Sequence, residues 1–254
     1  MTAALLQTTG LTKRFGRVAS LFEVSVRLEA GETVGVIGPN GAGKTTLFDC
    51  ILGVLQPDAG SVVFEGRRID RLPPFRRSLL GIGRTFQRLE LFSGLTPREH
   101  LLVTQRARGG HGALWKDVLG LGRPTPPEQR QAAEVLELVG LTDVADAPVE
   151  SLSLGKSRLV ELARALVGPP KLLLLDEPSS GLDDAERATL VSVLHRLGHD
   201  PEVAVVVVEH DLDLVSAVVE RLAVLDVGRV IADGPVDAVL TDPAVRAAYL
   251  GVGR

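Results

Sequence analysis

A short β-branched segment of this chain leads directly into a glycine-rich loop and then into a helix-forming segment. Residues 33–37 predict a buried strand, and residues 38–45 read Gly-Pro-Asn-Gly-Ala-Gly-Lys-Thr. Residues 44–55 predict a helix, which Pro57 and Gly60 bring to an end. The loop fits the pattern G-x-x-x-x-G-K-[ST], whose glycines let backbone N–H groups close around phosphate oxygens at a helix N-terminus. A chance glycine-rich turn would lack this strand–loop–helix context, so the segment predicts nucleotide binding.

Two side chains of the loop are expected to carry its chemistry. Lys44 would reach the β- and γ-phosphates, and the hydroxyl of Thr45 would bind Mg²⁺. The residues expected to contact the nucleotide are Gly38, Pro39, Asn40, Gly41, Ala42, Gly43, Lys44, Thr45 and Thr46.

An apolar strand further along the chain ends in two acids. Residues 171–175 predict a buried strand, and Asp176 and Glu177 follow it. Asp176 is expected to hold Mg²⁺, directly or through water. Glu177 can face the terminal phosphate, where a general base for water belongs. Taken alone, the segment is better interpreted as a buried strand with a solvated acidic end. Because the chain also contains the phosphate-binding loop, the functional interpretation is favoured.

The order of elements predicts an α/β fold. Short strands alternate with helices in the last third of the chain, with strands expected at 171–175 and 204–208 and a hairpin at 222–232. Such alternation is typical of a mostly parallel sheet with buried strands. The segment before Phe64 is β-rich, and residues 89–153 contain helical segments. We therefore expect a P-loop NTPase core with a mostly parallel sheet, an antiparallel β subdomain and an inserted α-helical lobe.

Individual helices are expected from residue 96 onward. One begins after Thr96 as N-cap and Pro97 as first helical residue. The expected helices span 96–106, 128–139, 156–167, 184–197 and 212–219, and a single strand is expected at 21–28.

Composition limits the classes of partner that the chain is expected to bind. The formal net charge of -4 at pH 7 disfavours a nucleic-acid binder, which would carry a basic excess. Cys50 is the only cysteine, so no disulfide can form within the chain, and we interpret it as a buried filler. No apolar run approaches the roughly 20 residues that span a bilayer. A role at a membrane would therefore depend on partner chains.

From about Leu6 to the C-terminus, the chain resembles the nucleotide-binding subunits of ABC transporters. Residues 84–87, Arg-Thr-Phe-Gln, resemble the Q-loop, which implies that Gln87 lies near Mg²⁺ and the attacking water. Residues 152–156, Leu-Ser-Leu-Gly-Lys, resemble the signature motif. Taken alone, Gln87 would be interpreted as a surface polar residue. No other class of P-loop protein combines these elements in this order.

Three more positions take their roles from this resemblance. Residues 179–183, Ser-Ser-Gly-Leu-Asp, resemble the D-loop, so Asp183 is assigned to the nucleotide site. His210 follows the strand 204–208 and resembles the switch histidine, which implies contact with the γ-phosphate. Phe15 lies where the family stacks an aromatic ring on adenine, with core packing as the alternative.

The signature departs from the common form Leu-Ser-Gly-Gly-Gln. Leu154 replaces the first glycine and Lys156 replaces the glutamine, whereas Ser153 and Gly155 are kept. The resemblance implies that Ser153 and Gly155 donate to the γ-phosphate of an ATP bound on the opposite subunit. We expect the site completed by this signature to be less active than usual, with a stronger signature on a partner cassette.

The resemblance also implies an organisation and a set of partners. One cassette is expected over 1–254, with the core and β subdomain at 1–88 and 157–235, the helical lobe at 89–156 and a helical tail at 236–254. Such a subunit binds ATP and Mg²⁺, dimerises on them and hydrolyses ATP at the cytoplasmic face of the membrane. The expected partners are permease subunits, a second cassette and an external solute-binding protein, and no nucleic acid. In the lobe, Trp115 with Arg106, Arg108 and Arg123 forms either a partner contact or a solvated loop.

Within the family, the chain looks most like the cassettes of branched-chain amino-acid importers. This likeness rests on residues 83–87, Leu91-Phe92, Leu95-Thr96 and the ending at 242–251. A lipopolysaccharide-export cassette has a similar ending and stays an alternative. A soluble ABC ATPase of DNA repair or translation would carry two cassettes or a coiled coil, and a P-loop kinase or GTPase would leave the signature helix unexplained. The substrate, the direction of transport and the type of dimer stay open.

Overall fold

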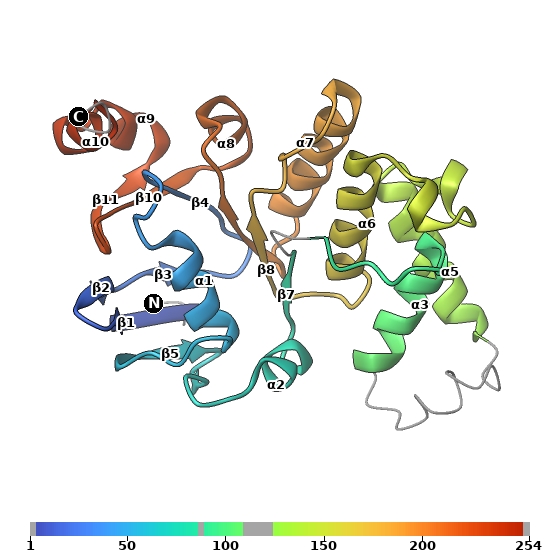
Figure 1. Cartoon of the computed structure of the whole chain (residues 1–254), viewed down its shortest axis with the longest axis horizontal. Helices are drawn as coiled ribbons and strands as arrows, with labels where there is room; N and C mark the ends of the chain where they lie inside the picture. The colour runs from blue at the N-terminus through green and yellow to red at the C-terminus, as the bar shows by residue number, and fades with distance from the viewer. Residues whose placement is uncertain (1–3, 86–88, 109–123, 251–254) are drawn as a thin grey trace. The chain divides into compact units, whose positions relative to one another are not determined.

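The computed structural model of the chain describes residues 4–85, 89–108 and 124–250 (Figure 1). The chain forms two compact units. The first comprises Met1–Ile82, Lys171–Glu177 and Leu194–Arg254, and the second comprises Gly83–Pro170 and Pro178–Val193. Each unit is therefore built from segments that lie far apart in the sequence.

Among the described residues, six strands form one mixed sheet in the order β11-β10-β4-β9-β8-β7. β10, β4, β9 and β8 run parallel, and β11 pairs antiparallel with β10. Every residue of β4, β8 and β9 is buried, which agrees with the continuous apolar runs expected of strands covered on both faces. The predicted parallel α/β core is confirmed. The strands are β4 (Thr33–Ile37), β7 (Ile82–Arg84), β8 (Leu172–Asp176), β9 (Ala204–Val208), β10 (Arg221–Asp226) and β11 (Arg229–Pro235).

A second sheet lies in the first unit and is antiparallel, in the order β2-β1-β5-β6 with β3 also on β1. The prediction of one strand over 21–28 is wrong in its middle. Val26 N–H donates to the Thr8 hydroxyl at 2.9 Å, and the Ser25 hydroxyl accepts from Gly10 N–H at 2.9 Å, so side chains interrupt the ladder. The strands are β1 (Leu6–Phe15), β2 (Val18–Val24), β3 (Arg27–Leu28), β5 (Ala59–Phe64) and β6 (Arg67–Arg68).

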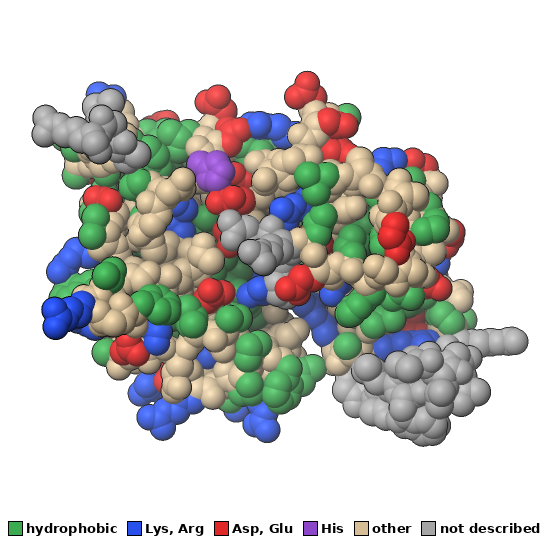
Figure 2. All heavy atoms as spheres, viewed as in Figure 1, with side chains coloured by type: hydrophobic (Ala, Val, Ile, Leu, Met, Phe, Trp, Pro, Cys, Tyr) green, Lys and Arg blue, Asp and Glu red, His purple; other side chains and the backbone are tan. Residues whose placement is uncertain are grey.

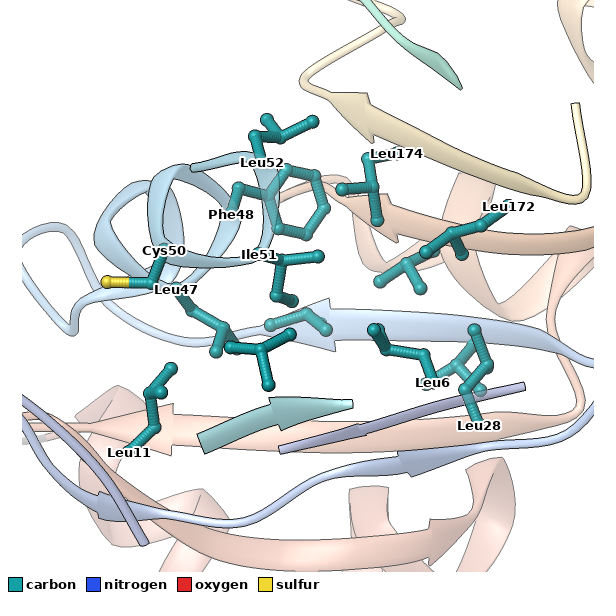
Figure 3. Packing of buried hydrophobic residues seen from close by; sticks show 14 of the residues in the cluster. Leu6, Leu11, Leu28, Leu47, Phe48, Cys50, Ile51, Leu52, Leu172 and Leu174 are labelled. Atoms are coloured by element: carbon teal, nitrogen blue, oxygen red, sulfur yellow. The ribbon is translucent and has the colours of Figure 1, made fainter. Parts of the chain in front are cut away.

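Helix α1 (Lys44–Leu52) packs on the strands of the first unit. Phe48 and Leu52 point from the helix toward Leu174 of β8 (Figure 3), and all three belong to one cluster of buried apolar side chains. The helix ends three residues before the predicted residue 55, because Gly53 adopts a left-handed conformation with φ of 80°. The packing fixes α1, and with it the loop that precedes the helix.

The buried side chain of Arg77 fastens the other end of α1. Arg77 belongs to α2 (Pro74–Leu79), a helix that the sequence analysis did not predict because six residues carry too short a periodic signal. Its Nη1 donates to the carbonyls of Cys50 at 2.7 Å and Ile51 at 2.6 Å, and its Nε donates to Leu72 at 2.9 Å. Carbonyls at a helix C-terminus have no partner within the helix and favour a cation. Cys50 is buried, as predicted.

Helices make up most of the second unit. α3 (Pro97–Arg108), α5 (Pro126–Leu138) and α6 (Leu154–Leu166) pack against one another, and short 3₁₀ turns at Thr142–Val144 and Val149–Ser151 join α5 to α6. The predicted helix start at Thr96 is confirmed, since its hydroxyl accepts from Glu99 N–H at 3.2 Å and Glu99 returns a bond to Thr96 N–H at 2.8 Å. The same reciprocal cap, between Thr125 and Glu128, opens α5.

The remaining helices follow strands of the first sheet. α7 (Asp184–Gly198) leads from the second unit back into the first, and α8 (Leu212–Val218) lies between β9 and β10 in the chain. α9 (Val236–Thr241) and α10 (Pro243–Leu250) contact β11. Within the residues that the structure describes, no helix is both long and apolar enough to cross a membrane.

Candidate nucleotide site and signature segment

The loop after β4 needs glycine at two positions for lack of space. A Cβ added to Gly38 would collide with the carbonyl oxygen of Leu225, and one added to Gly43 would collide with the carbonyl oxygen of Ser20. Both glycines also have positive φ, 150° and 106°. The loop is held by the turn between β10 and β11, where Gly228 N–H donates to Ala42 at 3.0 Å. Neighbouring strands thus set the shape of the loop.

Lys44 opens α1 with a buried ammonium group. Its side chain is 7% exposed, and Nζ donates to the carbonyls of Gly38 at 2.6 Å and Pro39 at 3.1 Å. Burial lowers the pKa of Lys44, and the charges of Glu177 and Asp176 raise it. The cation therefore lies inside the loop beside two carboxylates. Phosphate oxygens entering the loop would replace the two carbonyls as acceptors.

The two acids at the end of β8 have different surroundings. Asp176 is buried at 8% exposure and closes the strand, whereas Glu177 takes a left-handed conformation with φ of 49°. A residue with a Cβ rarely adopts this conformation, and such strain gathers at functional sites. The bond from Glu177 N–H to Val208 O, at 2.8 Å, holds the residue in place.

His210 lies against this strained glutamate. Its Nδ1 is 3.5 Å from Glu177 Oε1, and the histidine side chain is 57% exposed. On the face that Figure 2 shows, acidic side chains gather beside a histidine. The first unit therefore brings Lys44, Asp176, Glu177 and His210 together, from segments that the sequence separates.

Oxygen donors in the loop suit a small hard cation. Thr45 is exposed in the first turn of α1, and Thr46 shares a 2.8 Å hydrogen bond with Ser20. Among the described residues, no three His, Cys, Asp or Glu side chains gather where they could hold a metal ion. The hydroxyl of Thr45 and the carboxylate of Asp176 are oxygen ligands of the kind that Mg²⁺ prefers.

Among the other predicted residues, the structure places Phe15 in the first unit. The Phe15 ring is 51% exposed, with Lys13 Nζ 5.7 Å from its centroid, so core packing does not explain this aromatic residue. Stacking on adenine stays a prediction for Phe15. Gln87, like Trp115 and Arg123, lies outside the described residues.

The signature segment lies in the second unit and begins α6. Ser153 is the N-cap, since its hydroxyl accepts from Lys156 N–H at 3.0 Å. Lys156 Nζ pairs with Asp143 at 2.9 Å. Leu154 is 55% exposed, and a Cβ added to Gly181 would lie 2.7 Å from its Cδ2. Both residues that depart from the common signature therefore make contacts within the second unit.

The predicted D-loop residue Asp183 directly precedes α7 in the same unit. Its carboxylate accepts from Glu186 N–H at 2.8 Å, and Glu186 returns a bond to Asp183 N–H at 2.9 Å. Glu186 also accepts from the Ser153 hydroxyl at 2.9 Å. The sequence analysis missed Glu186, although the spacing Asp-x-x-Glu before a helix is the sign of a capping box. Ser153, Gly155 and Asp183 are thus brought together through a residue that was not predicted.

The comparisons with known proteins point to one family. A family model described as ABC transporter matches residues 21–180, and one described as Branched-chain amino acid ATP-binding cassette transporter matches residues 229–254. The high-affinity branched-chain amino acid transport ATP-binding protein BraF of Pseudomonas aeruginosa is 36% identical over 99% of both chains. LivG of Escherichia coli strain K12, which bears the same description, is 34% identical over 99% of both chains.

Solved structures show the same fold. A nucleotide-free ATP-binding cassette from an ABC transporter is 30% identical, with a TM-score of 0.83 over 97% of this chain and 99% of that chain. The ADP conformation of another ATP-binding cassette is 32% identical, with a TM-score of 0.81 over 98% of this chain and 100% of that chain.

Proposed function

Since the chain belongs to the ABC transporter family of ATP-binding cassettes and is an ATPase, we propose that it drives uptake of branched-chain amino acids through partner permeases. ATP would bind to the loop at the start of α1. The observation that carries the proposal is the meeting of Lys44, Glu177 and His210 beside one phosphate loop. Phosphoryl transfer to water uses a cation that neutralises the phosphate oxygens and a residue that positions the attacking water.

Glu177 is the general base in this proposal. Its carboxylate would orient the attacking water and accept the proton that the water loses. The left-handed backbone and the bond to Val208 restrict where this carboxylate can lie, and His210 Nδ1 restrains it further. Little reorganisation is then needed when the water attacks.

Lys44 binds and neutralises phosphate oxygens in this proposal. Its ammonium would give up the carbonyls of Gly38 and Pro39 and donate to the β- and γ-phosphates. Because the group is buried, water screens its charge poorly, and its attraction for an anion is strong. The residues proposed to hold Mg²⁺ are Thr45, Gln87 and Asp176, and the bound ion would stabilise charge that develops on the phosphate oxygens.

In this proposal, the second unit completes the ATP site of a partner cassette. Ser153 and Gly155 would donate to the γ-phosphate of an ATP on the partner cassette, with Asp183 beside them. The first turn of α6 favours this role, because N–H groups at a helix N-terminus attract anions. ATP would then hold two cassettes together until its hydrolysis releases them.

The transported substrate is proposed from the relatives. BraF and LivG are named for high-affinity transport of branched-chain amino acids, and both cover almost the whole chain. The match at residues 229–254 carries the same description. The proposed assembly contains two permeases at the membrane, a second cassette on its cytoplasmic face and an external solute-binding protein.

The second unit is the proposed contact of the permeases. Apolar side chains of Leu89, Phe92 and Val103 are exposed there, at 37%, 58% and 40%. Two of the arginines weighed for this contact are already engaged, because Arg106 pairs with Glu128 at 3.4 Å and Arg108 donates to the carbonyl of Gly168. The apolar residues are therefore better candidates for the permease contact than those two arginines.

The proposal is tested by what co-purifies with the chain. A tagged chain is captured from detergent-solubilised native membranes, and its partners are identified by mass spectrometry. We expect multi-span permeases, a second cassette and a solute-binding protein that binds leucine, isoleucine or valine in a calorimetric titration. Recovery of a lipopolysaccharide-binding complex would show that lipopolysaccharide, and not a branched-chain amino acid, is the substrate. Recovery of soluble partners alone would overturn the transport proposal.

A further inference from the structure

One carboxylate in the second unit bridges two segments that the proposed function assigns to ATP recognition. Glu186 Oε1 accepts from the hydroxyl of Ser153, in the signature segment, at 2.9 Å. Glu186 Oε2 accepts from the N–H of Asp183, in the D-loop, at 2.9 Å. These segments lie about thirty residues apart in sequence, since Ser153 and Glu186 are 33 positions apart. The carboxylate is thus their common anchor.

The same carboxylate lies directly against the glycine of the signature segment. A Cβ added to Gly155 would overlap the carboxylate of Glu186, so the group rests where only glycine leaves space. This place is the first turn of α6, a helix of 13 residues. An anion there is stabilised by the partial positive charge of the helix N-terminus. Glu186 therefore places a negative charge where the proposed function requires a phosphate.

Lys156, the lysine of the signature segment, does not pair with the carboxylate of Glu186. Lys156 Nζ is paired with Asp143 at 2.9 Å, in the turn Thr142–Val144. Leu154 contacts Gly181 of the D-loop, as its close approach to that glycine shows. Leu154 and Lys156, the two residues that depart from the common signature, therefore contact other segments of the second unit. Glu186 meanwhile accepts the hydrogen bond of the Ser153 hydroxyl.

We infer that Glu186 is a positioning residue that acts as an internal stand-in for phosphate and holds the signature segment in a resting state. This inference rests on the proposed function. In the isolated cassette, the Ser153 hydroxyl donates to Glu186. When the γ-phosphate of a partner-bound ATP reaches the segment, two anions compete for one donor, and the carboxylate must withdraw from Ser153. Closure of the dimer thus includes the cost of breaking this bond and of bringing like charges together.

The ordinary interpretation of Glu186 is a helix cap, and one substitution separates the two roles. Glutamine also serves at this position of a capping box, so Glu186→Gln keeps the bond to Asp183 N–H. The substitution removes the charge and turns the second atom, beside Ser153, from an acceptor into a donor. A pure cap predicts an unchanged dimer, whereas the resting-state role predicts a tighter one.

A matched control exists in the same unit. Glu99 closes the capping box of α3 by accepting from Thr96 N–H at 2.8 Å, and it is exposed. Glu99→Gln makes the same chemical change at the same position of another helix cap. The melting temperatures of the Glu186→Gln and Glu99→Gln chains should shift alike, which controls for loss of cap strength.

The experiment measures ATP-driven association of the full chain. All variants carry Glu177→Gln, which is expected to keep ATP bound, and sedimentation velocity in saturating MgATP gives the dissociation constant of the dimer. The chain is measured alone and mixed with the cassette that co-purifies with it. We expect Glu186→Gln to tighten the dimer at least about fivefold, the lower end of usual coupling between sites, and Glu99→Gln to leave it unchanged.

Each other outcome counts against the inference. Equal dimer dissociation constants for the parent and Glu186→Gln chains would show that Glu186 is only a helix cap. Chains that remain monomeric, both alone and with the second cassette, would also contradict the inference. A titration with a fluorescent ATP analogue separates this failure from that of the proposed function. Retained ATP binding with unchanged dimerisation would overturn only the role of Glu186, whereas loss of ATP binding by the parent would overturn both.

Discussion

At the scale of single residues, the site depends on two groups in energetically unfavourable states. Glu177 adopts a left-handed backbone, and Lys44 keeps a charge at 7% exposure. Conformations and charges of this kind persist only where the surrounding structure enforces them. Here β8, β9 and the loop carbonyls supply that restraint. The backbone strain lies in Glu177, the proposed acceptor of the proton, and the burial lies in Lys44, the proposed partner of the phosphates.

Glu177→Gln should separate binding from turnover. The amide keeps the shape of the side chain but cannot accept a proton from water, so hydrolysis should fall by about 10²- to 10⁴-fold. Binding of ATP should stay within about twofold, since Lys44 and the loop are untouched. Phosphate release and a titration with labelled ATP measure the two quantities. Turnover close to that of the parent would remove Glu177 from the role of base.

His100 should make stability depend on pH. It is 1% exposed, its Nε2 accepts from Phe92 N–H at 2.9 Å, and Nδ1 bonds Thr96 O at 2.9 Å, which requires the neutral ring. Burial lowers the pKa of His100, and the charge of Arg164 lowers it further, although the bond to Thr96 and the acids Glu99 and Glu150 raise it. The folded state thus binds fewer protons than the unfolded state below the ordinary pKa of about 6.5.

The sign of this effect follows from that difference. Stability is fully present above about pH 6.5 and is lost as pH falls from there toward the lowered pKa of the folded state, by up to about 1.4 kcal/mol per pH unit. Urea unfolding between pH 7.5 and 5.5 measures the loss. His100→Gln, which does not titrate, should show a smaller loss over this range. Equal slopes for the two chains would assign the loss to other groups. Glu161 is not one of them, because burial raises its pKa, so the folded state binds more protons there and gains stability as pH falls.

At the scale of elements, the phosphate loop is held from three sides. β4 leads into it, α1 leads out of it, and the turn after β10 bonds its Ala42. α1 is in turn fastened at its far end by Arg77, whose pKa burial lowers. The loop therefore keeps its shape because neighbouring elements are anchored.

Arg77→Met tests this anchoring. Methionine fills a similar volume but leaves the carbonyls of Cys50, Ile51 and Leu72 without their donor. Each buried carbonyl without a partner costs about 1–3 kcal/mol, and the bonds to Cys50 and Ile51 are the buried ones, so we expect a loss of roughly 2 kcal/mol or more in the free energy of unfolding. Arg76→Met, at an exposed neighbour, should change it by less than about 0.5 kcal/mol. Urea unfolding of both chains gives the comparison, and similar losses would deny Arg77 a special role.

At the scale of the whole molecule, the two proposed functions of the cassette lie in different units. The groups proposed to bind phosphate and to hydrolyse ATP belong to the first unit, and the segments proposed as signature and D-loop belong to the second. The chain passes from the first unit to the second at Gly83 and Pro178, and it returns to the first unit at Lys171 and Leu194. Glu177, the last residue of one segment of the first unit, is therefore followed directly in the chain by Pro178 of the second.

Nucleotide binding should stabilise the whole molecule through Lys44. A ligand that binds only the folded state stabilises it by about 2.7 kcal/mol at one hundred times its dissociation constant. Saturating MgATP should therefore raise the melting temperature of the parent and leave that of Lys44→Ala unchanged. Lys171→Ala, which removes an exposed lysine paired with Glu65 at 2.6 Å, should keep the full shift. A shift in Lys44→Ala equal to that of the parent would place ATP elsewhere.

The sequence alone determined the parts of this protein that depend on local pattern. The buried strands Thr33–Ile37, Leu172–Asp176 and Ala204–Val208 follow from continuous apolar runs, and the helix starts at Thr96 and Lys44 follow from cap chemistry and the glycine-rich loop. Residue types at fixed spacing likewise predict Lys44 and Glu177 as functional groups. These features need only neighbours within one element, so a linear pattern carries them.

Only the tertiary structure decided the contacts between distant segments. The bond between Ser153 and Glu186 spans 33 positions, and that between Arg77 and Cys50 spans 27, so neither leaves a periodic signal. The break between β2 and β3 depends on hydroxyls of Thr8 and Ser25 that meet a ladder formed elsewhere in the chain. Such contacts exist because packing brings particular backbones within hydrogen-bond distance, which is a property of the folded chain and not of any one of its segments.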